Sequence, residues 1–192
     1  FADSTLPADA KRLFHPLKLK SVNFNNKPIG GVAEIHPQVA DNFEAKQRIV
    51  KGERTIFLLS SGGNDTSFDN KNIAKTPIKE FKAKLERLFK LARKFSQNIV
   101  FIGLVPIDDT KTTPVFWDEN LFYKNAHIKE YDAIIRTFCK ENKVHFVEVF
   151  DKFIKLDYKS FLDEDDGLHL NSTGHQKLFE IVRDYLIKNK II

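Results

Sequence analysis

The sequence predicts an α/β fold in which a parallel sheet lies between two layers of helices. Two observations lead to this prediction. The chain contains short apolar runs that are continuous rather than alternating, and these runs alternate along the chain with segments of helical periodicity. Continuous apolar runs are typical of strands that are covered on both faces. Because strands that alternate with helices usually pair in parallel, we expect a three-layer α/β/α sandwich of the flavodoxin-like kind.

Three apolar runs are predicted to be buried strands, since each is rich in β-branched and aromatic residues. They cover residues 55–60, 99–105 and 144–150, and a weaker pattern predicts a further strand over 19–24.

Helical periodicity is clearest between Thr76 and Phe95, where apolar residues recur every three or four positions. Thr76 is predicted to be the N-cap of this helix, with Pro77 at its first position. The same periodicity predicts two more helices, over 125–142 and 172–188. Weaker patterns predict helices over about 8–17 and 37–50.

The segment 106–124 lacks helical periodicity and is predicted to be a long loop at the carboxyl end of a strand, which is the usual place of ligands in such sheets. Its aromatic residues have two interpretations, which the sequence leaves open. They form an apolar wall for an acyl group, or they anchor the loop to the core. The aromatic residues concerned are Phe116, Trp117, Phe122 and Tyr123.

Composition excludes several classes of protein. The chain has 192 residues, enough for one domain with a hydrophobic core, and we expect a single domain over 1–192. The formal charge of +5 is spread over many lysines without a basic stripe, so no nucleic-acid partner is expected. No apolar run approaches the roughly 20 residues of a membrane span. Cys139 stands alone, which excludes an internal disulfide framework and predicts a buried helix residue. The cytoplasm is slightly favoured as the compartment.

The clearest chemical motif lies just before the last predicted helix, where Asp166 precedes His169 by three residues. In a loop, this spacing allows the carboxylate to turn back and bond to the imidazole. The carboxylate then fixes the tautomer of the histidine and stabilises its protonated form, as in nucleophilic triads. The alternative is a surface turn whose residues cap the helix that follows.

Two glycine-bearing turns follow predicted strands. Residues 61–65 read Ser-Gly-Gly-Asn-Asp after the strand 55–60, and the amide of Asn64 is a suitable donor for an oxyanion. Residues 26–31 read Asn-Lys-Pro-Ile-Gly-Gly after the weak strand, where a backbone N–H of Gly31 is available as a second donor. Ordinary turn chemistry explains either segment when it is considered alone.

The three motifs together, in this order, resemble the conserved blocks of the SGNH hydrolases, also called the GDSL esterase/lipase family. The resemblance covers nearly the whole chain. Residues 62–65 are similar to the family's G-x-N-D block, and residues 166–171 are similar to its D-G-x-H-x-N block. Residues 26–31 are similar to its N-x-G-x-x-G block, although Pro28 stands where glycine is usual.

The resemblance implies a serine esterase that cleaves an acyl ester through a covalent acyl-enzyme. His169 would be the general base and then the general acid, Asp166 would orient it, and Asn64 and the Gly31 N–H would be oxyanion donors. It also implies a sheet of strand order 2-1-3-4-5, no metal and no organic cofactor. The substrate would be an acyl ester of a small molecule, a lipid or a sugar.

The serine nucleophile of the family has two candidates. Ser4, in the segment Phe1-Ala2-Asp3-Ser4, is similar to the G-D-S block with alanine for glycine. The other interpretation places the block, and the first central strand, upstream of Phe1, which makes the chain an N-terminally truncated member. An alternative function is a catalytically inactive ligand-binding module that keeps the crevice without turnover.

Overall fold

The computed structural model describes residue 52 and residues 54–192. Within this part of the chain, three parallel strands form a sheet in the order β1 (Phe57–Leu59), β2 (Ile99–Ile102) and β3 (His145–Val147). Phe57 pairs with Ile99 across the first ladder, and Phe101 pairs with Phe146 across the second. The predicted parallel sheet is therefore confirmed, and each strand is shorter than its apolar run.

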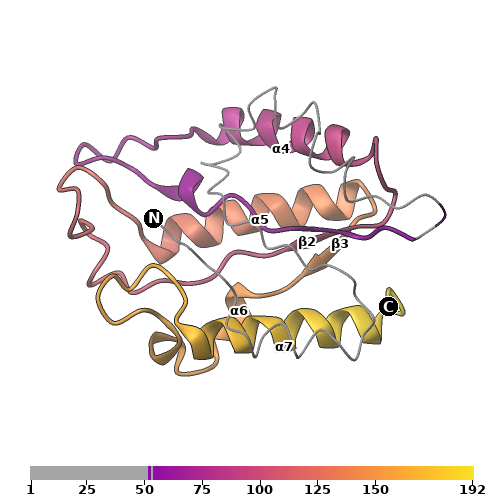
Figure 1. Ribbon diagram of the computed structural model, residues 1–192. Coiled ribbons are helices and arrows are strands. Elements are labelled where there is room, and N and C mark those ends of the chain that lie inside the picture. The colour runs from indigo at the N-terminus through magenta and orange to yellow at the C-terminus, as the bar shows by residue number, and fades with distance from the viewer. Residues whose placement is uncertain (1–51, 53) are drawn as a thin grey trace.

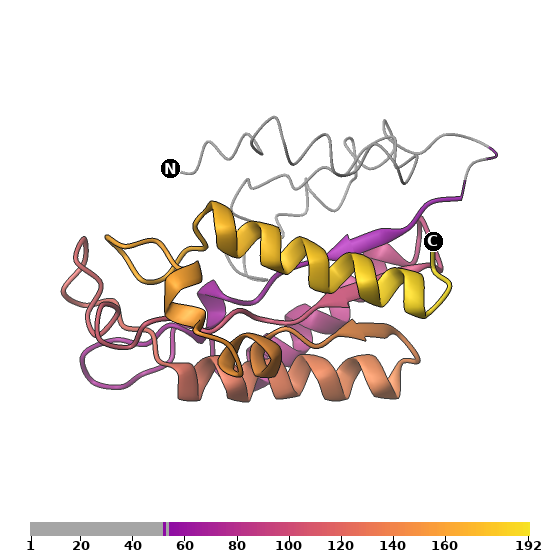
Figure 2. The same ribbon diagram turned by 90° about the horizontal axis from the view of Figure 1, so that it is seen from below.

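Helices cover both faces of this sheet (Figures 1 and 2). They are α4 (Ile78–Ala92), α5 (Asn125–Glu141) and α7 (Ser172–Lys188). In Figure 2, α7 lies on one side of the strands, and α4 and α5 lie on the other. These three helices match the predicted segments closely, and α7 has the predicted bounds.

The central strand shows why the sheet needs cover on both faces. Ile99 and Phe101 pack into the apolar cluster under α4 and α5, whereas Val100 and Ile102 pack into the cluster under α7. All four residues are buried. This alternation follows from the two-residue repeat of a strand, and it confirms the three-layer α/β/α arrangement.

One part of the strand prediction is wrong. The run 144–150 was expected to be extended throughout, but β3 ends at Val147 and a short helix, α6 (Phe150–Ile154), begins at Phe150. Phe150 and Phe153 lie three residues apart and are both buried, which fits one face of a helical turn. A 3₁₀ turn, η4 (Tyr158–Phe161), then leads to the Asp166–His169 segment.

The start of α4 also differs from the prediction. Pro77, rather than Thr76, occupies the N-cap position, and its carbonyl accepts a hydrogen bond from the Phe81 N–H at 2.9 Å. Thr76 is buried, and its backbone carbonyl accepts a hydrogen bond from the Tyr131 hydroxyl. Thr76 is therefore used to join α5 to the segment before α4. Because proline has no N–H, it leaves no backbone donor unsatisfied at the N-cap.

Several predictions lie outside the described residues. These are the weak strand 19–24, the helices 8–17 and 37–50, and the first central strand upstream of Phe1. The single domain over 1–192 likewise stays a prediction. Among the described residues, no helix combines the length and the apolar character needed to span a bilayer. Cys139 is buried in α5, as predicted.

Candidate active site

Asp166 and His169 are brought together as the sequence predicted. The Nδ1 atom of His169 lies 2.6 Å from Oδ2 of Asp166. The other carboxylate oxygen, Oδ1, accepts hydrogen bonds from the backbone N–H groups of Leu168 at 2.7 Å and His169 at 2.9 Å. The acid therefore holds both the ring and the backbone of the histidine, which leaves Nε2 as the ring atom that is free of the carboxylate.

The environment of this pair suits an ionised acid beside an accessible base. The Asp166 side chain is only 15% exposed, whereas the His169 side chain is 64% exposed. Burial acts to raise the pKa of Asp166, but the hydrogen bonds from the His169 ring and from the backbone N–H groups of His169 and Leu168 outweigh it, so the pKa is lowered. Asp166 is then negative at neutral pH and suited to accept a hydrogen bond from Nδ1; in the neutral tautomer with the proton on Nδ1, Nε2 is the nitrogen that carries the lone pair.

Glycine at position 167 is required by the shape of this turn. Its φ is +62°, in the left-handed region that favours glycine. A Cβ atom at this position would also lie 3.0 Å from the Cβ atoms of both Asp108 and Lys111. The glycine of the D-G-x-H segment therefore allows the chain to reverse and to approach the neighbouring loop.

Asn171 fixes the other end of the turn. Its Oδ1 accepts the Gly174 N–H at 2.9 Å as the N-cap of α7, and its Nδ2 donates to the carbonyls of Ser160 and Leu162. One side chain thus joins η4 and Leu162, the residue after it, to the first turn of α7. Residues of this turn therefore cap the helix that follows, as the alternative interpretation of the segment expects, but the turn also brings Asp166 to His169.

The Asp166–His169 turn is braced by the loop that follows β2. The Asp108 N–H donates to the carbonyl of Gly167 at 2.8 Å, and the Lys111 ammonium donates to the carbonyl of Glu164. Lys159, from η4, forms a 2.8 Å ion pair with Oδ1 of Asp108. These contacts hold together residues that are far apart in the sequence, and we call them the loop brace.

The turn after β1 is organised differently, by the core beneath it. Gly62 has a φ of +110°, and a Cβ atom there would lie 3.2 Å from the Phe81 ring and 3.4 Å from Ile135. The chain then enters the 3₁₀ turn η3 (Asn64–Thr66), in which Asn64 is exposed while Thr66 is buried. The amide of Asn64 is thus presented at the surface by a turn whose base is packed on α4 and α5.

Both turns lie at the carboxyl end of the sheet (Figures 1 and 2). Asn64 follows β1, and Asp166 and His169 lie in the segment that leads into α7. The arrangement places an amide donor and an acid–base pair at the same edge of the sheet. The two further predicted site residues, Gly31 and Ser4, lie outside the described residues.

Some aromatic residues of the long loop 106–124 anchor it to the core, and others are exposed near the acid–base pair. Tyr123 is buried, and Phe122 pairs through its backbone with Phe68, so these two anchor the loop. Phe116 and Trp117, in contrast, are 73% and 46% exposed. Trp117 lies next to the acid–base pair, because its ring centroid is 6.5 Å from that of His169 with the planes 28° apart.

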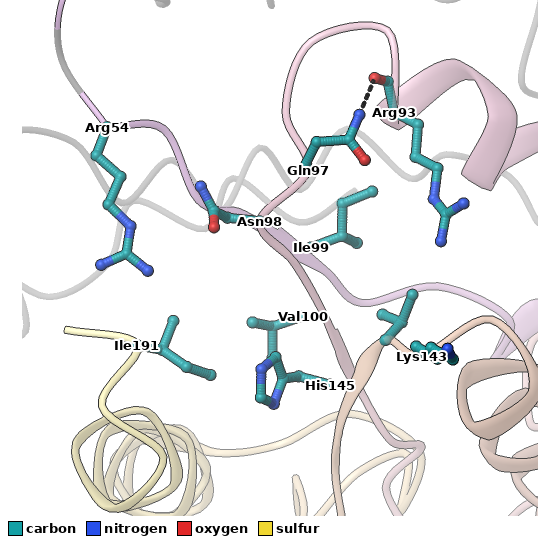
Figure 3. Close-up of a pocket in the computed structure, with 10 residues that line it drawn as sticks. Arg54, Arg93, Gln97, Asn98, Ile99, Val100, Lys143, His145 and Ile191 are labelled. Atoms are coloured by element: carbon teal, nitrogen blue, oxygen red, sulfur yellow. Dashed lines mark hydrogen bonds between the residues drawn. The ribbon is translucent and has the colours of Figure 1, made fainter.

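A separate pocket lies at the opposite, amino end of the sheet (Figure 3). It is lined by the residues at the start of β2 and β3, together with the basic side chains of Arg54, Arg93 and Lys143. Arg93 is engaged there, since its guanidinium donates to the carbonyl of Asn142 at 2.9 Å. The pocket contains neither the acid–base pair nor Asn64, so it is distinct from the candidate active site.

Comparison with protein families agrees with this geometry. The model of the GDSL-like lipase/acylhydrolase family matches residues 10–177. The chain belongs to this family. The match includes the Asn64 turn and the Asp166–His169 turn, and it confirms, at the level of the family, the predicted class of GDSL-type carboxylic ester hydrolases.

Solved structures of similar fold come from several organisms. A lipase/acylhydrolase from Enterococcus faecalis has a TM-score of 0.61 at 13% identity, over 81% of this chain and 70% of that chain. An acetylxylan esterase from Geobacillus stearothermophilus has a TM-score of 0.57 at 15% identity, over 81% and 67%. A G-D-S-L family protein from Veillonella parvula has a TM-score of 0.55 at 12% identity, over 80% and 73%. These likenesses establish the fold.

A curated relative is similar over a short stretch. The phenylalanine–tRNA ligase beta subunit of a Wolbachia species is 33% identical over 64 residues, which are 33% of this chain and 8% of the relative. The chain therefore spans less than a tenth of that relative's length, and the match carries no functional argument.

Sequence reasoning missed the residues that support the turn from a distance. The sequence places Asp108 only in the long loop 106–124, yet the residue is 8% exposed and holds both Gly167 and Lys159. Gly174 was not singled out, although a Cβ atom there would lie 2.1 Å from the Phe161 carbonyl oxygen. No local feature of the sequence marks Asp108. Gly174 does carry a local signal, because it stands in the first turn of the predicted helix 172–188 and glycine is unfavourable within helices.

Proposed function

We propose that this protein hydrolyses a small acyl ester through a covalent acyl-serine intermediate. In this mechanism, Nε2 of His169 takes the proton from the serine hydroxyl as its oxygen attacks the ester carbonyl. Collapse of the tetrahedral intermediate transfers the proton to the oxygen of the departing alcohol. Water then attacks the acyl-enzyme with His169 again acting as base, which releases the acid and restores the serine.

The observation that carries the proposal is the 2.6 Å contact between Asp166 and His169, in which the acid also binds two backbone N–H groups of the turn. An ionised carboxylate at this position keeps the proton on Nδ1 and stabilises the imidazolium that forms during attack. A surface turn that served only to cap α7 would not need the ring contact, because Asn171 already provides the cap.

Asn64 and Gly31 are proposed as the oxyanion donors. The exposed position of Asn64 on η3, at the same end of the sheet as His169, supports its part in this role. A donor of this kind stabilises the negative charge on the former carbonyl oxygen by about 3–4 kcal/mol. The nucleophile is proposed to be a serine of the G-D-S block, and both candidates for it lie outside the described residues.

The substrate is proposed to be a short acyl ester, with an acetylated sugar as the favoured class. Support comes from the fold neighbours, of which several bear the name acetyl xylan esterase. The open setting of His169, whose side chain is 64% exposed, is also compatible with a bulky alcohol half.

The proposal is tested with the whole protein by hydrolysis of p-nitrophenyl acetate and by labelling with a fluorophosphonate. Replacement of His169 by alanine is expected to lower kcat by a factor of about 10³ or more, and Asp166→Asn by a somewhat smaller factor. His145→Ala is the matched control, because His145 is exposed at the amino end of β3 and should leave activity unchanged.

Two results would contradict the mechanism. The first is ester hydrolysis that persists in the His169→Ala variant. The second is a wild-type protein that neither hydrolyses esters nor reacts with the fluorophosphonate, which would favour the inactive ligand-binding module.

A further inference from the structure

Phe116 and Trp117 form an exposed aromatic pair beside the acid–base turn. Their ring centroids lie 4.8 Å apart with the planes at 90°, so the rings meet edge to face. Trp117 continues toward His169, whose ring centroid is 6.5 Å away and whose plane is tilted by 28°. Two large aromatic side chains are therefore held in the open next to the proposed general base.

The aromatic pair lies where the alcohol half of the ester is expected to bind. In the proposed mechanism, His169 returns its proton to the oxygen of the departing alcohol. That oxygen must lie within hydrogen-bond reach of Nε2, so the alcohol half of the ester lies against the imidazole ring. A side chain that flanks the imidazole is thus placed to contact the alcohol half.

We propose that Phe116 and Trp117 form a binding platform for the alcohol half of the substrate, and that this half is a neutral pyranose ring. The inference rests on the ester hydrolysis proposed above and adds to it the residues that determine specificity. Aromatic rings have a negative face that attracts polarised C–H bonds, and one face of a pyranose presents such bonds.

The surroundings of the pair favour a sugar over a hydrocarbon chain. An alkyl chain is held best by a continuous apolar groove. The two rings instead stand beside polar residues of the same loop tip, Asp118, Glu119 and Asn120, of which the last two are exposed. A ring that is apolar on one face and carries hydroxyl groups at its rim fits both parts of this surface.

The base of the loop is fixed, which makes the platform preorganised. Val115, directly before the pair, is 1% exposed, and its N–H donates to the Leu121 carbonyl at 2.9 Å. The buried Thr112 hydroxyl lies 3.1 Å from the Asp108 carbonyl and 3.0 Å from the Tyr123 carbonyl. A platform that is already ordered loses little conformational entropy on binding, which favours affinity.

A kinetic comparison tests the proposal with two acetate esters that differ only in the alcohol: O-acetylated methyl β-xylopyranoside and ethyl acetate. For Trp117→Ala, kcat/KM is expected to fall about tenfold on the acetylated xyloside and less than about twofold on ethyl acetate. Trp117→Tyr should restore most of the loss. Ile187→Ala, which removes an exposed apolar side chain at the far end of α7, is the control and should change neither rate.

Two kinetic outcomes would overturn the platform. An equal loss on both esters would mean that Trp117 acts only by positioning His169. A loss that depends on the acyl group, seen by comparing ethyl acetate with ethyl butyrate, would mean that the pair binds the acyl half instead.

Direct binding separates this inference from the proposed function. Trp117 is the single tryptophan of the chain, so intrinsic fluorescence reports on the platform itself. Titration of the His169→Ala variant with methyl β-xylopyranoside should shift or quench this emission, whether or not the wild type is an esterase. No change at millimolar sugar would overturn the platform, while absence of hydrolysis by the wild type would contradict only the mechanism.

Discussion

The two turns at the carboxyl end of the sheet are held in place by different forces. The turn at 62–67 lies on the core, where Gly62 packs against Phe81 and Ile135. The turn at 163–169 lies at the surface and is held by hydrogen bonds from Asp108 and Lys111 of the loop brace, in which Asp108 is itself paired with Lys159. The proposed oxyanion donor is thus positioned by apolar packing, and the acid–base pair by polar contacts between distant segments.

This difference predicts that damage to the first turn reduces stability, whereas damage to the second reduces activity. Packing defects in a core are costly because close-packed interiors relax only partially. Surface ion pairs and exposed loops contribute little to the free energy of unfolding. They still decide the position of side chains, and catalysis is sensitive to shifts of about 1 Å.

The largest effect on stability is expected from Gly62→Ala. The variant adds a Cβ atom 3.2 Å from the Phe81 ring at a φ of +110°, so the free energy of unfolding should fall by about 2–4 kcal/mol. Urea unfolding measures the change. Gly63→Ala is the matched control, since its φ is −58° and a Cβ atom there meets nothing within 4 Å. Equal losses in the two variants would contradict the role of packing.

A smaller loss of stability with a clear loss of activity is expected from Gly167→Ala. The φ of +62° costs an alanine about 1–2 kcal/mol, and the Cβ atom would press on the side chains of Asp108 and Lys111. The shift should move His169 and lower kcat/KM by about 10- to 100-fold. Steady-state kinetics and urea unfolding measure the two effects. Asp165→Ala, an exposed change in the same turn, should alter neither.

The smallest change in stability is expected from Lys159→Met, which removes the ion pair with Asp108. Lys159 is half exposed, and the buried Asp108 carboxylate keeps its hydrogen bonds from the backbone N–H and the hydroxyl of Thr110, so the urea midpoint should move little. The loop brace would lose one of its contacts, and kcat/KM should fall about tenfold if the brace positions the acid–base pair. Lys155→Met, at the exposed end of α6, is the control. Unchanged kinetics would show that the backbone contacts of the brace are sufficient.

The sequence was most informative where structure depends on neighbours along the chain. The helical periodicity of residues 125–142 and 172–188 predicted the bounds of helices α5 and α7 almost to the residue. The spacing of Asp166 and His169 correctly predicted the contact between their side chains, because a separation of three residues in a turn is enough to bring the two together. Where a local pattern was ambiguous, as at Phe150, the strand prediction failed and a helix formed instead.

The sequence by itself therefore determined the order of the predicted strands and long helices, the bounds of α5 and α7, and the acid–histidine pair. Only the tertiary structure decided that Asp108 and Lys159 brace the turn, and that Phe116 and Trp117 lie exposed beside His169 while Tyr123 is buried. The physical reason is sequence distance. Contacts between residues about fifty positions apart depend on the path of the whole chain, and a local pattern of apolar and polar residues does not encode it.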